Sequence, residues 1–150
     1  MGVALIALLH GPNLNLLGQR EPDVYGTSTL DDYVACARVA AAALGHDLEA
    51  FQTNHEGELV DAIHGARGRA AAIVINPGAF THYAWSIHDA LAAFEGPVVE
   101  VHISNPNARE PWRHTSVVAP VASGSIAGLG MHGYELAIAA VARRLGEGRR

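Results

Sequence analysis

The sequence predicts a doubly wound α/β fold, in which a parallel sheet of five strands lies between two layers of helices. Short apolar segments of strand length alternate along the chain with longer segments whose apolar residues recur at helical spacing. Most of the strand segments are apolar on both faces, as expected of parallel strands that helices cover on both sides. At 150 residues the chain has the size of one domain, so we expect a single domain over residues 1–150.

The first half of the chain is predicted to contain two strands and two helices. Residues 3–9 form an apolar run of strand length, and residues 47–52 form a second, shorter strand. Between them, a helix is predicted from the cap-like Thr29 to Gly45. The spacing of Thr53 and Glu56 is typical of a capping box and predicts a second helix. The apolar stripes are Leu30, Val34, Ala37, Ala41 and Leu44 in the first helix, and Leu59, Ile63 and Ala66 in the second.

The second half continues the alternation. Residues 70–76 are a strongly apolar strand, residues 97–102 a fourth strand and residues 125–129 a weak fifth. The last helix carries Arg143 and Arg144 at its negative end. We expect residues 146–150 to be a frayed tail. The stripes that predict the third and last helices are Ala84, Ile87, Leu91 and Phe94, and Tyr134, Ile138, Val141 and Leu145.

Five such strands suit the flavodoxin-like order 2-1-3-4-5, giving three layers, α/β/α. In that order the first, third and fourth strands are neighbours, and ligands bind beyond their carboxyl ends. Those ends carry polar segments at residues 10–13, 76–78 and 102–105, which we expect to converge on one crevice. The connection from the first strand to the first helix, residues 10–29, is far longer than the usual two to six residues. We interpret residues 18–26 of this connection as an active-site lid.

Composition excludes several classes of function. The net charge is −5 with no basic stripe, which argues against nucleic acid as a partner, and no apolar run is long enough to span a membrane. The chain shows no signal-peptide pattern and has a single cysteine, Cys36, so we expect a cytoplasmic protein. All ten basic residues are arginine, which excludes Schiff-base chemistry and the lysine of a P-loop.

Two patterns are interpreted as decoys. Gly128, Gly130 and Gly133 match a dinucleotide-binding G-x-G-x-x-G, but too few residues follow to complete such a unit. We expect these glycines to allow close packing of the last strand and helix. Nine histidines could suggest a metal site, but none shows a metal-ligand spacing, so we expect no metal.

Arg20, Tyr25, Glu100 and His102 are the candidates for acid–base chemistry. A guanidinium beside Tyr25 would favour a tyrosinate, which could serve as a base. The alternative is that Arg20 pairs with Glu21 while Tyr25 packs over the core. Glu100 and His102 alternate along one strand and so share a face, where the carboxylate could orient a general-acid imidazole. The alternative is a histidine satisfied by a backbone carbonyl.

Further candidates concern binding of an acidic substrate. The backbone around Ile103 and Ser104 could hold a carboxylate, and Arg109 and Arg113 could add cationic anchors. Surface ion pairing is the alternative for both arginines. The third predicted helix presents a polar face, which we interpret as a subunit contact or a solvated surface; its residues are His82, Trp85 and Asp89.

The chain closely resembles the type II 3-dehydroquinate dehydratases over nearly its whole length. The blocks that carry the resemblance are GPNLNLLGQREPDVYG, QTNHEGELVDAIHGA, INPGAFTH, EVHISNPNAREPWRH and GSIAGLGMHGYELA. The resemblance implies a flavodoxin-like subunit and a cofactor-free hydro-lyase that converts 3-dehydroquinate to 3-dehydroshikimate through an enolate. It also implies a place in the shikimate pathway or in quinate catabolism, and a dodecamer built as a tetramer of trimers.

The resemblance also implies roles for individual residues. Tyr25 is similar to the base that removes a proton from C2, and Arg20 to its activator. Asn13 resembles the residue that holds a water against the enolate. His102 resembles the acid that protonates the leaving hydroxyl, with Glu100 as its orienter. Substrate-binding positions are matched by Asn76, His82, Ile103, Ser104 and Arg113, and by Asp89 reaching in from the neighbouring subunit; Arg109 matches an arginine of the same block, without an assigned role.

The chain departs mildly from the family pattern. Tyr83, Ala84 and Trp85 replace small polar and aliphatic residues, and Trp112 stands where phenylalanine is common. These changes concern subunit contacts and pocket shape. Two other hypotheses remain at this point: a flavodoxin-like module that binds FMN at the switch point, and a homologue that binds a related acid without turning it over.

Overall fold

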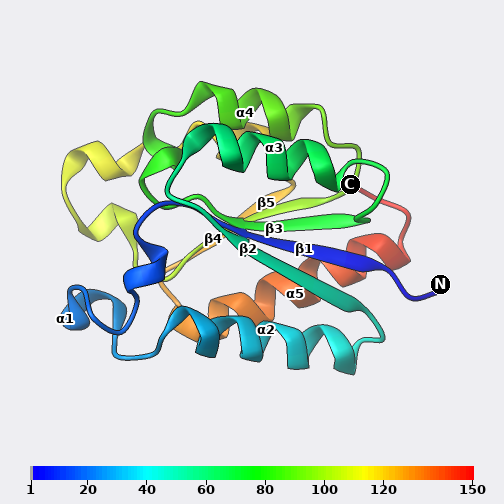
Figure 1. The fold of residues 1–150 in the computed structure, drawn as a ribbon, viewed down its shortest axis with the longest axis horizontal. Helices are drawn as coiled ribbons and strands as arrows, with labels where there is room; N and C mark the ends of the chain where they lie inside the picture. The colour runs from blue at the N-terminus through cyan, green and yellow to red at the C-terminus, as the bar shows by residue number, and fades with distance from the viewer. Residues whose placement is uncertain (1) are drawn as a thin grey trace.

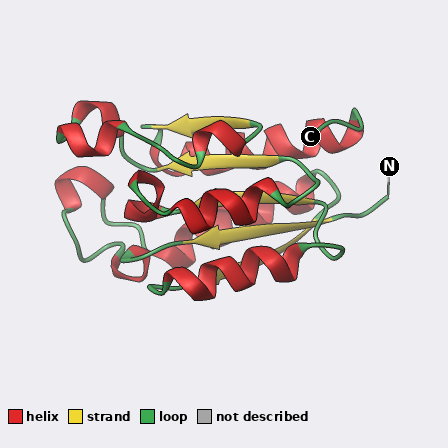
Figure 2. Ribbon diagram, turned by 90° about the horizontal axis from the view of Figure 1, so that it is seen from above, coloured by secondary structure: helices red, strands yellow, loops and turns green. Residues whose placement is uncertain are grey.

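The computed structural model describes residues 2–150 and contains one five-stranded sheet (Figure 1). The strands are β1 (Leu5–His10), β2 (Asp47–Gln52), β3 (Ala72–Asn76), β4 (Val98–His102) and β5 (Gly124–Ala127). All neighbouring strands are parallel, in the order β2-β1-β3-β4-β5, and their arrows point the same way in Figure 2. The predicted fold class and strand order are therefore confirmed.

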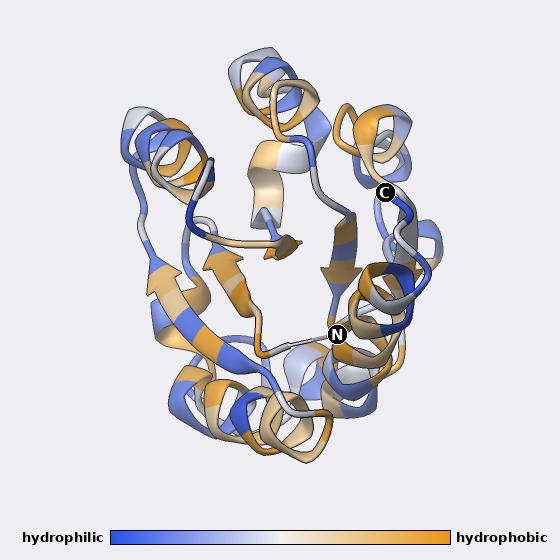
Figure 3. Ribbon diagram, turned by 90° about the vertical axis from the view of Figure 1, so that its right-hand side faces the viewer, coloured by the Kyte–Doolittle hydropathy of each residue, from blue (hydrophilic) through white to orange (hydrophobic). Residues whose placement is uncertain are grey.

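Helices cover both faces of the sheet, as the apolar strands require. Figure 1 shows α2 (Leu30–Ala43) and α5 (Gly130–Gly146) on one face, and α3 (Glu56–Ala66) and α4 (Trp85–Ala92) on the other. A one-turn helix, α1 (Pro22–Tyr25), lies in the long connection after β1. The hydrophobic stripes of the helices face the sheet (Figure 3) and form one buried core on each side of it.

The helix ends follow local hydrogen bonding, and one predicted cap is wrong. Thr29 and Asp32 form the reciprocal capping box that begins α2. Thr53 does not cap α3: its hydroxyl accepts from the His55 N–H and donates to the Glu58 carboxylate. The helix therefore begins after His55, because a local turn has used the hydroxyl that a capping box would need.

The segments that follow β1 and β3 come very close together beyond the carboxyl ends of these strands. The Gly11 N–H donates to the Asn76 carbonyl oxygen at 2.8 Å. A Cβ atom added at Gly11 would lie 2.1 Å from the carbonyl oxygen of Pro77, so only glycine permits this approach. The loops after β1 and β3 are thereby held side by side.

The C-terminal tail was expected to fray, and in the structure its last residue contacts the body of the protein. The Arg150 guanidinium donates to the carbonyl oxygens of Leu91 and Val121, at 3.1 and 3.2 Å. Within the described residues no helix is both long and apolar enough to cross a bilayer.

Candidate active site

A cleft of about 200 Å³ lies beyond the carboxyl ends of β1, β3 and β4, where the strand order predicts a ligand site. The first long connection, the loop after β3 and the segment after β4 all contribute to its walls. The sequence-predicted site residues that line it are Asn13, Arg20, Tyr25, Asn76, His82, His102, Ile103, Ser104 and Arg113. Arg109 and Trp112 line it as well. The three polar strand ends do converge, as the sequence predicted.

Residues 18–26, the predicted lid, place Tyr25 between two guanidiniums. Arg109 Nη1 donates to the Tyr25 Oη at 2.7 Å, and Arg20 Nη2 lies 3.5 Å from the same oxygen. Both guanidiniums also lie over the ring, 5.2 and 4.6 Å from its centroid. Arg20 pairs with Glu21 at 2.9 Å at the same time, so the two arrangements considered for Arg20 occur together.

Arg109 makes the shorter contact to Tyr25, whereas the sequence had suggested it only as a cationic anchor for an acidic substrate. Its side chain is 13% exposed and bridges from Tyr25 to the Ser104 hydroxyl at 3.2 Å. Arg109 and Tyr25 are 84 positions apart, so no local spacing could have paired them. The sequence pointed to Arg109 only through its positive charge and its place in the block EVHISNPNAREPWRH, which follows β4.

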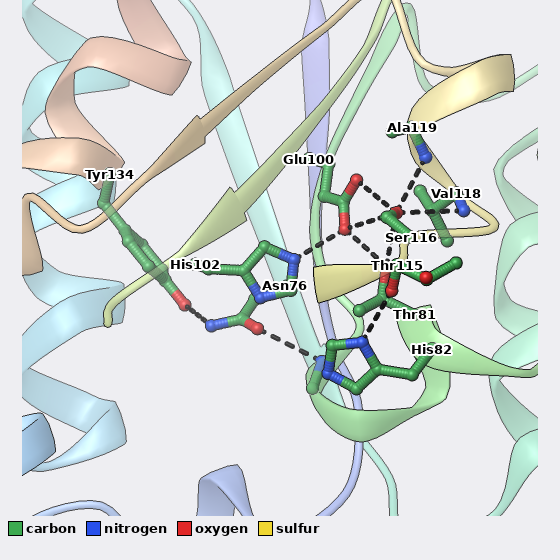
Figure 4. Close-up of polar contacts among 11 residues, drawn as sticks. Asn76, Thr81, His82, Glu100, His102, Thr115, Ser116, Val118, Ala119 and Tyr134 are labelled. Carbon is green, nitrogen blue, oxygen red and sulfur yellow. Dashed lines mark hydrogen bonds and ion pairs between the residues drawn. The ribbon is translucent and has the colours of Figure 1, made fainter. Parts of the chain in front are cut away.

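Glu100 and His102 form the second cluster of the cleft, as alternation along β4 predicted. His102 Nε2 lies 2.5 Å from Glu100 Oε2, and the carboxyl group is buried. Two hydroxyls also donate to Glu100 (Figure 4): Thr81 Oγ1 to the same oxygen, Oε2, at 2.5 Å, and Ser116 Oγ to Oε1 at 2.9 Å. Neither Thr81 nor Ser116 was singled out from the sequence.

These contacts decide the charge of the carboxyl group. Burial raises the pKa of Glu100, but the hydrogen bonds from His102, Thr81 and Ser116 outweigh it and leave the pKa below its usual value. Glu100 is therefore a carboxylate that can orient an imidazole and balance its positive charge. Among the described residues, no group of three or more His, Cys, Asp or Glu side chains could hold a metal.

Asn76 and His82 are each fixed by hydrogen bonds to other groups of the protein. Asn76 Nδ2 donates to the hydroxyl of Tyr134 at 3.1 Å, and its Oδ1 accepts from the Gly78 N–H at 3.2 Å. His82 Nδ1 lies 2.7 Å from the Thr115 carbonyl oxygen. Burial lowers the pKa of His82, which favours a neutral ring that can accept or donate a hydrogen bond.

Comparison with known proteins identifies the family. The family model described as "Dehydroquinase class II" matches residues 4–142, almost the whole chain. The chain belongs to the class II dehydroquinase family. The resemblance stated from the sequence motifs is thus confirmed, and the protein is an enzyme of the hydro-lyase class.

Curated relatives of this class II dehydroquinase carry two kinds of name. A protein of Bacillus licheniformis named 3-dehydroquinate dehydratase is 56% identical over 133 residues, covering 89% of this chain and 92% of the relative. A catabolic 3-dehydroquinase of Aspergillus clavatus is also 56% identical, over 137 residues that cover 91% of each chain. Equal identity to both favours neither a biosynthetic nor a catabolic role.

Solved structures agree with the fold of this class II dehydroquinase. The type II dehydroquinase of Propionibacterium acnes superposes with a TM-score of 0.88 at 46% identity, covering 95% of this chain and 98% of that one. That of Butyrivibrio crossotus gives 0.89 at 43% identity, covering 93% and 97%.

Two predicted site residues of this dehydroquinase do not line the cleft. Glu100 lies behind the wall and reaches the cleft only through His102. Asp89 is exposed on α4 and is absent from the cleft formed by its own chain. Its neighbour Trp85 is 62% exposed, so this face of α4 is open in the single chain.

Proposed function

We propose that this hydro-lyase removes water from 3-dehydroquinate through an enolate, with Tyr25 as base and His102 as acid. The observation that carries the proposal is the pair of clusters facing one cleft. On one side a tyrosine hydroxyl contacts two guanidiniums, and on the other an imidazole contacts a buried carboxylate. The first arrangement suits proton removal and the second suits proton delivery.

The first step takes a proton from C2, next to the ketone of the substrate. The Tyr25 oxygen forms the new O–H bond, and the C–H electron pair moves into the enolate. Arg20 and Arg109 place positive charge beside the Tyr25 oxygen, which suits the negatively charged base that begins this step. Asn13 lines the cleft, and we assign to it the binding of a water against the enolate oxygen.

The second step expels the C1 hydroxyl. His102, protonated and held by Glu100, gives its proton to the departing oxygen, and the enolate electrons re-form the ketone with a new C=C bond. Water and the conjugated enone leave. The cycle closes when Tyr25 loses its proton and His102 regains one from solvent. No lysine is needed, in agreement with a sequence that contains none.

Binding of the substrate carboxylate is assigned to the segment after β4. Ile103 and Ser104 lie in the cleft wall at the end of the strand, and Arg113 adds positive charge from the next segment. Arg113 also pairs with Glu110 at 2.8 Å, which fixes its guanidinium at the rim. We assign Asn76 and His82 to the hydroxyl groups of the substrate, because both are held rigidly by their outer contacts.

The assembly is proposed to be a dodecamer in which Asp89 completes the cleft of a neighbouring subunit. The support is the position of Asp89 on the open face of α4, away from the cleft of its own chain. The exposed Trp85 on the same face would be covered by such a contact.

A 3-dehydroquinate assay that follows the ultraviolet absorbance of the enone tests the proposal. We expect turnover by the wild type and a loss of 10³-fold or more in kcat for Tyr25→Phe, with binding of substrate retained, because only the acid–base oxygen is removed (roughly 10²- to 10⁴-fold per general base). No turnover by a folded wild type would refute the function. Equal activity of the two proteins would refute the role of Tyr25. The same preparation should be colourless, whereas the competing hypothesis of an FMN-binding module predicts a yellow protein.

A further inference from the structure

Behind Asn76, away from the cleft, lies a continuous chain of buried polar groups. His10 ends β1, Tyr134 lies on the first turns of α5, and all three side chains are almost fully buried. His10 Nε2 lies 3.0 Å from the Tyr134 Oη, and that oxygen lies 3.1 Å from Asn76 Nδ2. The rings of His10 and Tyr134 are also stacked, with centroids 5.7 Å apart.

The direction of each hydrogen bond in this series of side chains follows from its inner end, which is His10. His10 Nδ1 faces the carbonyl oxygen of Phe51 at 3.3 Å, and a carbonyl can only accept, so Nδ1 carries the proton. The ring is neutral, since burial lowers the pKa of His10 to about 4, and Nε2 is therefore an acceptor. The Tyr134 hydroxyl must then donate to His10, which leaves its oxygen to accept from Asn76.

The outer end gives the same answer independently. Asn76 Oδ1 faces the N–H of Gly78 at 3.2 Å, and this backbone group can only donate. Turning the amide over would set two donors against each other at Gly78 and would leave Tyr134 facing a carbonyl oxygen. The His10 end and the Gly78 end of this hydrogen-bonded series therefore require the same orientation of the Asn76 amide.

We propose that His10 and Tyr134 are positioning residues of the catalytic cleft, which lock the Asn76 amide so that its donor and acceptor are presented to the substrate in a fixed order. The amide nitrogen uses one N–H on Tyr134 and the amide oxygen uses one lone pair on Gly78, so each keeps one capacity for the substrate: the second N–H of Nδ2 and the second lone pair of Oδ1. This inference rests on the proposed function, because it assigns the free capacities to the bound substrate.

The buried setting makes the hydrogen bonds of His10 and Tyr134 effective in holding the Asn76 amide. Hydrogen bonds within a low-dielectric interior are strong, and breaking one leaves a buried group unsatisfied. No buried side-chain nitrogen or oxygen lacks a partner among the described residues, so the chain of groups is complete as it stands. Removing the Tyr134 oxygen would take away the inner acceptor of Asn76 Nδ2 and leave the amide oriented by its contact to the Gly78 N–H, so that it is held less firmly.

Tyr134→Phe tests the proposal, with Tyr33→Phe as the matched control. The Tyr33 ring packs against Tyr134 with centroids 5.0 Å apart in the same core, and its hydroxyl makes no side-chain hydrogen bond to the described residues. We expect Tyr134→Phe to raise KM for 3-dehydroquinate about tenfold with kcat changed less than about threefold, since a contact made equally in ground and transition states is lost. Tyr33→Phe should move neither constant. A purely structural role of Tyr134 would instead lower kcat, through a smaller active fraction, and leave KM unchanged.

The coupling to Asn76 provides a second, sharper criterion. In an Asn76→Ala background, Tyr134→Phe should change KM less than about twofold, because a positioning residue has nothing left to position. Independent effects that multiply would overturn the proposal. His10→Gln keeps an acceptor for the Tyr134 hydroxyl and should stay near the wild type, whereas His10→Leu should resemble Tyr134→Phe. Wild-type turnover with an unchanged KM in Tyr134→Phe would defeat this inference alone, while absence of wild-type turnover would defeat the proposed function.

Discussion

Replacing His10 by glutamine tests how much this buried imidazole contributes to the pH dependence of the free energy of unfolding. Burial lowers the pKa of His10 from 6.5 to about 4, partly offset by the hydrogen bond to Phe51. Between these two values the unfolded chain binds a proton that the folded protein does not bind. The unfolded state is therefore favoured as the pH falls, and the stability contributed by a neutral His10 is lost from about pH 6.5 downward.

The magnitude follows from the difference of about 2.5 between the two pKa values. At about 1.4 kcal/mol for each unit, the full loss is about 3 kcal/mol, and about 2.5 kcal/mol of it falls between pH 7.5 and pH 4.5. No discount for solvent screening is needed, because the His10 side chain is 0% exposed. Glutamine does not titrate in this range and offers an oxygen acceptor to the same hydroxyl of Tyr134.

The measurement is urea unfolding of the wild type and His10→Gln at a series of pH values and one fixed protein concentration. It gives the difference in free energy of unfolding between the two proteins at each pH. We expect the wild type to lose about 2.5 kcal/mol relative to the variant between pH 7.5 and pH 4.5. His64→Gln, on the exposed face of α3, is the control and should follow the wild type at every pH. Parallel curves for the wild type and His10→Gln would refute the argument, since they would mean that folding does not change the protonation of His10.

Two further predictions concern the cleft and the assembly. Arg109→Gln should lower kcat/KM by about 10²-fold, at least as much as Arg20→Gln, because Arg109 makes the shorter contact to the lid tyrosine; steady-state kinetics of both variants measures this, and more than a third of wild-type activity in Arg109→Gln would contradict it. Light scattering should give a mass near twelve times 15.8 kDa, and Asp89→Asn should raise KM without changing that mass; a fully active monomer would contradict the shared site.

The helices and strands of this fold were predictable because each depends on the spacing of apolar residues within a short segment. The five strands and four long helices were located to within a few residues, and the stripe of α4 is buried as expected. Pairing of Glu100 with His102 was predictable for the same reason, since both lie on one face of β4. The α3 cap failed because Thr53 has two competing local partners, which spacing alone does not rank.

Contacts between distant segments could not be predicted in this way. Arg109 meets Tyr25 across 84 positions, and Tyr134 meets His10 across 124. In the sequence, Tyr134 was only a member of an apolar stripe, and its hydroxyl gave no sign of a partner. Burial implies that a histidine ending an apolar strand and a tyrosine in a buried stripe each need a hydrogen-bond partner, but it does not identify that partner.

The two halves of the cleft differ in how firmly the fold holds them. His102 and Asn76 end strands of the central sheet, and each is held from behind by a buried group, Glu100 and Tyr134. Tyr25 lies instead on a one-turn helix in a long connection, and its hydrogen bonds come from two arginines that line the cleft themselves. The binding and acid groups are thus organised before substrate arrives, whereas the base depends on the position of the lid. In the proposed mechanism the first proton transfer therefore depends on how residues 18–26 hold Tyr25 over the cleft.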